Sequence, residues 1–309
     1  MLTRITCRAV AASGLRRQAR LFGSTASKIP LTCDDGQSDL ARSLAPPSGR
    51  RFEGKNAVVT GGRMGVGLTI ARSLAAEGAN VCIVDLKDAS TAVAAIQAAD
   101  STTGSISQVV CDITEEAAVV SMGTQVGQTF GGKLDVLVNN AGYNGKCQLV
   151  RDMKVEDWEL TLRINLTGTM MVTRELIPAL EAASGNVANV ASNVARRGLP
   201  YRADYVCSKW AVIGLTQTLA LELVGAGVRV NGVCPGPIEG ERIEQVMDMH
   251  MEAEGISDYS AMRDGWEGVP MRRFATSEEV ANAIKFLVSD DSSFCTGQMI
   301  NVTGGFIMT

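Results

Sequence analysis

Short apolar runs rich in β-branched residues alternate with longer stretches of helical character from about residue 52 onward. Seven runs have the length and composition of strands: NAVVTGG, NVCIVDL, ISQVVCDI, LDVLVNNAG, GNVANVAS, VRVNGVCPG and QMINVTGG. Continuous apolar runs separated by helices are typical of parallel strands that are covered on both faces. The pattern therefore predicts an α/β fold with a doubly wound parallel sheet of about seven strands and helices on both faces.

The region before residue 51 lacks this alternation. Residues 28–50 are polar, contain proline and glycine, and show no sustained periodicity, which predicts a linker. Residues 1–27 contain five arginines, many serines, threonines and alanines, and no acidic residue. This composition is typical of a transit peptide and favours a mitochondrial matrix address over a plastid one, with a disordered basic tail as the alternative. We expect a single folded domain at 51–309.

Composition and charge exclude several classes of protein. With 46% hydrophobic residues in a chain of 309, a sizeable core is expected. The eight cysteines show no CxxC pair, and the single His250 has no second ligand nearby, so we expect reduced thiols, no metal site and a histidine on the surface of a mobile segment. Removing residues 1–27 takes away five positive charges and moves the formal net charge from −4 to −9. An acidic protein binds nucleic acid poorly, and no membrane span is expected.

The first strand runs into a glycine-rich turn and then a helix, in the stretch NAVVTGGRMGVGLTIARSLAAEGA. Gly61, Gly65 and Gly67 let the backbone approach a pyrophosphate, and the helix N-terminus offers free N–H groups to its charge. The second strand ends with Asp85, 18 residues beyond Gly67, where an acid meets the hydroxyls of an adenosine ribose. An acid there repels a 2′-phosphate, so the sequence favours NAD over NADP.

The spacing TGxxxGxG resembles the single-domain branch of the short-chain dehydrogenase/reductase family, over nearly all of the chain after residue 52. The resemblance implies a Rossmann-type fold, contact of Asp112 with adenine, and a stabilising NNAG turn beside the cofactor. For Arg63 a solvated turn residue is favoured over a phosphate ligand. The predicted cofactor-binding residues are Gly61, Arg63, Gly65, Val66, Gly67, Asp85, Asp112, Ile113, Asn139, Ala141, Gly142, Tyr205, Lys209, Pro235, Gly236 and Ile238.

Tyr205 and Lys209 lie four residues apart at the start of a long apolar run. On a helix this spacing puts both side chains on one face, where the ammonium group favours the phenolate. Hydride transfer at an alcohol carbon requires a proton to move at the oxygen, and a tyrosine with a pKa of about 10 needs such help at neutral pH. The pair therefore predicts an acid/base for alcohol or carbonyl chemistry.

The family's catalytic set is Asn, Ser, Tyr and Lys, and this chain has candidates in that order: Asn165, Ser192, Tyr205 and Lys209. Ser192 precedes Tyr205 by 13 residues. The resemblance implies that Lys209 also binds the nicotinamide ribose, that Ser192 polarises the substrate oxygen, and that Asn165 holds a water that links Lys209 to solvent.

The helix that carries the pair is apolar on more than one face until Gly225 and Gly227 end it. Since only one side can face the sheet, we expect the other to pack against a second subunit in a homodimer or homotetramer, as the resemblance also implies. Burial within one chain is the alternative.

Residues 238–270 correspond to the segment that covers the substrate in this family. Its methionines are expected to fill the core beneath a helix, and its acids to form a solvated face. Gly240 stands where the family usually has a threonine that touches the nicotinamide amide, and Thr303 is expected to be structural.

Three arginines lie between Ser192 and Tyr205: Arg196, Arg197 and Arg202. One of them could bind a substrate carboxylate, although ion pairing at a surface or between subunits is favoured.

The function expected from these motifs is an NAD-dependent alcohol dehydrogenase or carbonyl reductase that acts on a small molecule. A 3-oxoacyl thioester reductase is the alternative among enzymes, and a non-catalytic NAD-binding sensor or scaffold is the alternative outside them. An epimerase or dehydratase is disfavoured, since these relatives typically show TGxxGxxG and a larger C-terminal domain. Fold and motif do not identify a substrate.

Overall fold

The computed structural model describes residues 50–99, 102, 104–255 and 268–309. The chain from residue 49 onward forms one compact unit. The expected targeting segment at 1–27, nearly all of the linker at 28–50, and residues 256–267 of the expected substrate lid lie outside the described residues.

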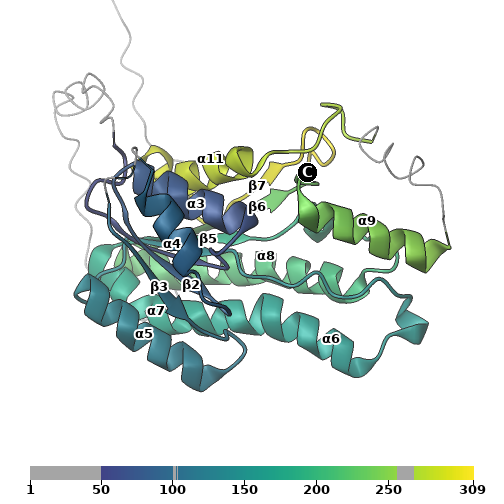
Figure 1. Ribbon diagram of the computed structural model, residues 1–309, viewed down its shortest axis with the longest axis horizontal. Coiled ribbons are helices and arrows are strands. Elements are labelled where there is room, and N and C mark those ends of the chain that lie inside the picture. Colours follow the sequence, from purple (N-terminus) through teal and green to yellow (C-terminus); the bar gives the residue numbers. More distant parts are fainter. Residues whose placement is uncertain (1–49, 100–101, 103, 256–267) are drawn as a thin grey trace, which may run out of the picture. The chain divides into compact units, whose positions relative to one another are not determined.

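Seven parallel strands form one sheet in the order β3-β2-β1-β4-β5-β6-β7 (Figure 1). The strands are β1 (Asn56–Thr60), β2 (Asn80–Asp85), β3 (Ile106–Val110), β4 (Val136–Asn139), β5 (Asn186–Val190), β6 (Arg229–Pro235) and β7 (Met299–Val302). Each lies within the apolar run that predicted it, so the predicted fold class is confirmed. The strand order reverses between β1 and β4, and ligands bind at the carboxyl ends of the strands at such a point.

Helices cover both faces of the sheet (Figure 1). One face is covered by α3 (Gly65–Ala76), α4 (Ser90–Gln97) and α11 (Ser277–Val288), and the other by α5 (Glu116–Phe130), α7 (Thr169–Ala183) and α8 (Ala203–Leu223). Two further helices, α6 (Val155–Leu162) and α9 (Glu241–Glu254), extend beyond the sheet. No helix within the described ranges has the length and apolarity that a membrane crossing requires.

The strand side chains alternate between two apolar clusters. In β1, Ala57 and Val59 belong to the cluster beneath α3 and α11, whereas Val58 belongs to the cluster beneath α5 and α7. All three are fully buried. Burial on both faces explains why the strands appear in the sequence as continuous apolar runs.

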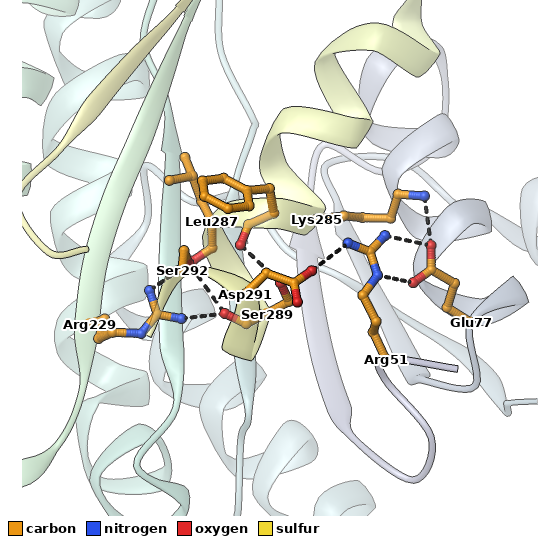
Figure 2. A network of polar contacts seen from close by, with 9 residues as sticks. Arg51, Glu77, Arg229, Lys285, Leu287, Ser289, Asp291 and Ser292 are labelled. Atoms are coloured by element: carbon orange, nitrogen blue, oxygen red, sulfur yellow. Dashed lines mark hydrogen bonds and ion pairs between the residues drawn. The ribbon is translucent and has the colours of Figure 1, made fainter. Parts of the chain in front are cut away.

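A polar network ties the segment before β1 to the far ends of two helices (Figure 2). The Arg51 guanidinium donates to both carboxylate oxygens of Glu77, at 2.8 and 2.9 Å. Lys285 of α11 donates to the same carboxylate at 2.7 Å, and Arg51 also reaches Asp291 at 3.3 Å. These contacts lie at the edge of the sheet opposite the carboxyl ends of the strands, so they concern stability and not the site.

Candidate active site

Hydrogen bonds around Thr60 join the carboxyl ends of β1 and β4. The Thr60 hydroxyl accepts from the backbone N–H groups of Asn140 and Ala141, both at 3.0 Å. The Asn140 side-chain amide donates to the carbonyl oxygens of Thr60 and Gly61, also at 3.0 Å. The NNAG turn is therefore fixed directly to the glycine turn.

Asn139, a predicted cofactor-binding residue, lies within the sheet layer beneath this turn. It is buried, and its side-chain amide donates to Thr173 and Asn189, both at 2.9 Å. The sequence analysis included Asn139 and missed Asn140. Both are asparagines at the end of the same strand, and only the alternation of side chains along β4 determines which of them meets the glycine turn.

The glycine turn leaves no room for side chains at two positions. A Cβ on Gly67 would collide with the Gly61 carbonyl oxygen, and one on Gly61 would lie 2.8 Å from the Cα of Ala141. Gly65 and Val66 begin α3, whose first turn has neither a side-chain cap nor an acidic residue. The N–H groups of this turn are left for an anion, which fits the pyrophosphate of a dinucleotide.

Asp85 ends β2 beside the glycine turn. Its carboxylate accepts from the backbone N–H groups of Arg63 and Lys87, both at 3.2 Å. The Arg63 Nε lies 3.8 Å from the Asp85 Oδ1, so this turn residue, whose side chain is 36% exposed, is paired with the acid. Carboxylate and guanidinium thus lie together where the adenosine ribose is expected.

Asp112 and Ile113 follow β3, the strand next to β2. The Asp112 Oδ1 accepts from the backbone N–H and the hydroxyl of Thr114, at 2.9 and 2.7 Å, and Ile113 is buried. The acid therefore fixes the turn after β3, at the same edge of the sheet as Asp85. Its predicted contact with adenine remains a prediction.

Tyr205 and Lys209 lie one turn apart near the start of α8. Lys209 is 4% exposed, and its Nζ donates to the carbonyl oxygen of Val190, the last residue of β5, at 2.8 Å. The same Nζ lies 5.9 Å from the centre of the Tyr205 ring. The helix thus holds phenol and amine together at the carboxyl end of the sheet.

The surroundings change the acidity of both groups. Burial raises the pKa of the Tyr205 phenol. The positive charge of Lys209 lowers this pKa, and so do Arg242, Arg202 and the polar side chain of Ser192. Together these groups bring the pKa of Tyr205 below its ordinary value. Burial lowers the pKa of the Lys209 amine, partly offset by the charge of Tyr205. The phenol is therefore a better acid than a free tyrosine.

Ser192 follows β5 and caps a short 3₁₀ turn, Asn193–Arg196. It is 8% exposed, its hydroxyl accepts from the Val194 N–H at 3.4 Å, and it donates to the Asn193 Oδ1 at 3.1 Å. Ser192 also lies close enough to Tyr205 to help lower the pKa of its phenol, so the two side chains belong to one polar centre. A serine hydroxyl can donate to a carbonyl oxygen or accept from an alcohol.

Asn165 lies in a π-helical turn, Arg163–Gly168, and such turns occur frequently at functional sites. Its Oδ1 accepts from the Tyr143 N–H at 2.7 Å, and its Nδ2 donates to the Tyr143 carbonyl and to Ser208, both at 2.9 Å. Ser208 in turn donates to the Tyr205 carbonyl at 2.8 Å. The sequence analysis missed Ser208, which connects Asn165 to the helix that carries Tyr205.

Pro235 ends β6, and the predicted residues beyond it are held by backbone pairing. The Gly236 N–H donates to the Val302 carbonyl at 2.8 Å, and Ile238 forms a parallel bridge with Ala275. The chain thereby leaves the sheet next to the carboxyl ends of β5 and β6. Their contacts with the cofactor remain a prediction.

Two departures from the family pattern have local explanations. Gly240, in place of the usual threonine, precedes α9 with φ of 121°, a conformation that a threonine adopts only with strain. Thr303 exchanges hydrogen bonds with the backbone of Ile307, at 3.0 and 3.2 Å. The structural role expected for Thr303 is therefore confirmed.

The three arginines after Ser192 have different surroundings. Arg196 donates to the Met299 carbonyl at 3.2 Å, and the Arg197 guanidinium lies 4.3 Å from the centre of the Phe306 ring. Arg202 is 2% exposed and lies 4.9 Å from the centre of the Tyr205 ring. None of the three forms an ion pair with another described residue, and the expected ion pairing at a surface or between subunits stays a prediction.

The exposed position expected for His250 is also wrong. The side chain is 9% exposed, and its ring meets that of Tyr201 edge-on, with centroids 6.2 Å apart. The reason is that α9 is amphipathic, with His250 and the half-buried Met247 and Met251 on its inner side and its acids exposed. The expected solvated acidic face is thus confirmed. Met262, one of the methionines expected to lie beneath this helix, is outside the described residues.

Comparison with known proteins gives consistent results. A family model described as Enoyl-(Acyl carrier protein) reductase matches residues 61–307. The 3-oxoacyl-[acyl-carrier-protein] reductase FabG of Thermotoga maritima is 36% identical over 259 residues, which cover 84% of this chain and all of that protein. The D-beta-hydroxybutyrate dehydrogenase of Rhizobium meliloti is 32% identical over 82% of this chain and 98% of its own length.

Among solved structures, an NAD⁺-bound xylitol dehydrogenase is similar with a TM-score of 0.77 and 32% sequence identity, covering 82% of this chain and all of that one. The glycine turn, the NNAG turn and the Asn, Ser, Tyr and Lys side chains all lie inside the matched region. The chain therefore belongs to the short-chain dehydrogenase/reductase family of oxidoreductases.

Proposed function

We propose that the protein transfers a hydride between NAD and a secondary alcohol or ketone, with Tyr205 as the general acid/base. The observation that supports this best is the buried Lys209 amine, which lies one helical turn from Tyr205 and 5.9 Å from the centre of its ring. A nicotinamide dinucleotide, when bound, supplies the hydride donor or acceptor. The likeness to an NAD⁺-bound xylitol dehydrogenase and the acid at Asp85 both favour NAD.

In oxidation, the Tyr205 phenolate takes the proton from the substrate hydroxyl while the hydride leaves the carbon. Lys209 stabilises that phenolate, and in reduction the phenol returns the proton to the carbonyl oxygen. The Ser192 hydroxyl can donate to the substrate oxygen in both directions, since the single proton of the alcohol is given to Tyr205. Asn165 holds the Tyr143 backbone and, through Ser208, the start of α8.

The variant Tyr205→Phe tests the proposal, because it removes the proton-transferring hydroxyl and keeps the ring. We expect kcat to fall by about 10²- to 10⁴-fold, while the Kd for NADH stays unchanged. Turnover is measured by the absorbance of reduced nicotinamide on a panel of secondary alcohols and ketones, with NAD and with NADP. Undiminished activity of the phenylalanine variant would exclude Tyr205 as the acid/base.

A 3-oxoacyl thioester reductase is a second candidate, favoured by the similarity to the Thermotoga maritima protein. Acetoacetyl-CoA, included in the same panel, separates the two functions. A kcat/KM for this thioester far above that for free ketones would favour the second candidate.

We also infer that the protein is a homodimer or homotetramer that associates through α8. An exposed stripe runs along this helix at Cys207, Trp210, Gly214, Thr218 and Leu221. Trp210 is 49% exposed and Leu221 is 73% exposed, so two large apolar side chains of this stripe would be covered by a second subunit. Analytical ultracentrifugation of the wild type and of Trp210→Glu tests the inference, and a monomeric wild type would contradict it.

Import into the mitochondrial matrix is a further proposal, supported by the composition of residues 1–27. A fluorescent protein fused behind residues 1–50 should enter mitochondria, and a fusion in which the five arginines of residues 1–27 are replaced by glutamine should not. Accumulation in plastids or in the cytosol would count against the proposal.

A further inference from the structure

Two guanidinium groups near Tyr205 help to lower the pKa of its phenol but neither accept nor give the proton in the proposed transfer. The first belongs to Arg202, which lies 4.9 Å from the centre of the Tyr205 ring and is 2% exposed. It donates to the carbonyl oxygen of Asn144 at 2.6 Å and to the Cys147 sulfur at 3.5 Å. Its Nε is buried without a hydrogen-bond partner in the described structure. A buried charge and an orphaned donor therefore lie directly against the tyrosine.

The second guanidinium belongs to Arg242, an exposed residue in the first turn of α9. It donates to the Asn144 side-chain oxygen at 3.0 Å and to the Gly142 carbonyl at 3.3 Å. Gly142 itself lies next to the Lys209 amine, since a Cβ on this glycine would be 3.5 Å from the Lys209 Nζ. The hydrogen bond to Gly142 therefore places Arg242 at the same edge of the active site as that amine. Both arginines thus bind Asn144, one at its backbone and one at its side chain.

Among the described residues, neither guanidinium is paired with an acid. Within the described ranges, no carboxylate lies within ion-pair distance of Arg202 or Arg242. The acid nearest to Arg202 in sequence, Asp204, is fully buried and accepts from the Thr161 hydroxyl and from the Tyr205 N–H, both at 2.7 Å. With Lys209, three cationic groups lie around Tyr205, and a charge buried without a partner is costly. Such a site is complementary to an anion.

We propose that the substrate is a hydroxy acid or the corresponding oxo acid, and that Arg242 binds its carboxylate while buried Arg202 supplies a fixed positive field. The inference rests on the proposed alcohol or ketone chemistry at Tyr205 and adds the substrate class. Arg242 is the direct ligand because it is exposed, whereas Arg202 is enclosed. The carboxylate replaces water as the partner of the remaining Arg242 donors. Arg196 and Arg197 are excluded, since they contact Met299 and Phe306 instead.

The first test is binding without turnover. Butanoate, hexanoate and benzoate are titrated into the enzyme with NADH by calorimetry, each beside its primary amide. We expect at least one carboxylate to bind more tightly than its amide. Arg242→Met should weaken carboxylate binding by roughly 10- to 100-fold and leave the amide unchanged, because the lost contact is charge-assisted. Arg242→Lys should restore part of the affinity.

Two comparisons make the result specific. Lys133→Met removes the same charge from an exposed turn before β4, at the opposite edge of the sheet, and should change nothing. In turnover, Arg242→Met should raise KM for 3-hydroxybutanoate and not for 3-hydroxybutanamide. Equal effects on the acid and the amide would mean that Arg242 only holds α9 in place, and would overturn the proposal.

A wild type that prefers no carboxylate to its amide would overturn it as well. Failure of the proposed function has a different signature. Undiminished turnover by Tyr205→Phe would refute the acid/base while leaving carboxylate binding by Arg242 measurable.

Discussion

At the scale of single residues, we expect one acid and one guanidinium to decide the preference between NAD and NADP. The Asp85 carboxylate accepts two backbone N–H groups and lies 3.8 Å from the Arg63 Nε. With the acid in place, a 2′-phosphate would meet a negative charge, and the guanidinium is already paired. Without the acid, the same guanidinium becomes a phosphate-binding group.

Asp85→Asn should therefore shift the preference from NAD toward NADP. We expect the ratio of kcat/KM for NADP to that for NAD to rise at least about tenfold, which corresponds to about 1.4 kcal/mol. Asp290→Asn, which removes an exposed negative charge after α11, is the matched control and should leave the ratio unchanged. A wild type that already prefers NADP would show that Arg63, and not Asp85, dominates.

At the scale of elements, Glu77 holds three parts of the fold together at the edge opposite the site. It receives hydrogen bonds from Arg51, before β1, and from Lys285, on α11 (Figure 2). Burial alone would raise the pKa of Glu77, but these two cations outweigh it and lower the pKa below its ordinary value. An ionised Glu77 thus stabilises the folded state.

Glu77→Gln should lower the free energy of unfolding by about 1–2 kcal/mol, between the values typical of exposed and of buried pairs. Because the folded-state pKa is lowered, the full difference from the wild type is present above the ordinary glutamate pKa of about 4.3 and disappears as the pH falls through the lower folded value. Thermal unfolding of both proteins at pH 7 and at a series of lower pH values measures this difference in the free energy of unfolding. A difference that persisted at the lowest pH would assign the effect to packing instead of charge.

At the scale of the whole molecule, the features that could be predicted from sequence are those that follow from local patterns, namely the strands of the sheet and the Tyr205–Lys209 pair. The strands are apolar on both faces and the Tyr205–Lys209 pair is local, so pattern and spacing sufficed for both. Arg242, Asn140 and the buried His250 could not be predicted, because their neighbours depend on where α9 and the end of β4 lie in space. Arg202 was considered from its position near Tyr205, but its burial follows only from the packing of the chain around Asn144.

The same arrangement determines how the site acts. Residues from β1, β4, β5 and α8 meet at one edge of the sheet, and the three nearby cations lower the pKa of a single phenol. Alcohol oxidation needs the phenolate, so its rate should rise with pH through the Tyr205 pKa and then level off. Because that pKa is lowered, the plateau is reached at a lower pH than a free tyrosine would allow.

Direct titration of Tyr205 by NMR is the closest test of the claim that Lys209 lowers the pKa of Tyr205. Only four tyrosines need to be labelled with ¹³C, and Tyr205→Phe identifies the signal. We predict a midpoint below the ordinary value of about 10 in the wild type, and a midpoint at least about one pH unit higher in Lys209→Met. Equal midpoints in the two proteins would show that Lys209 does not activate Tyr205.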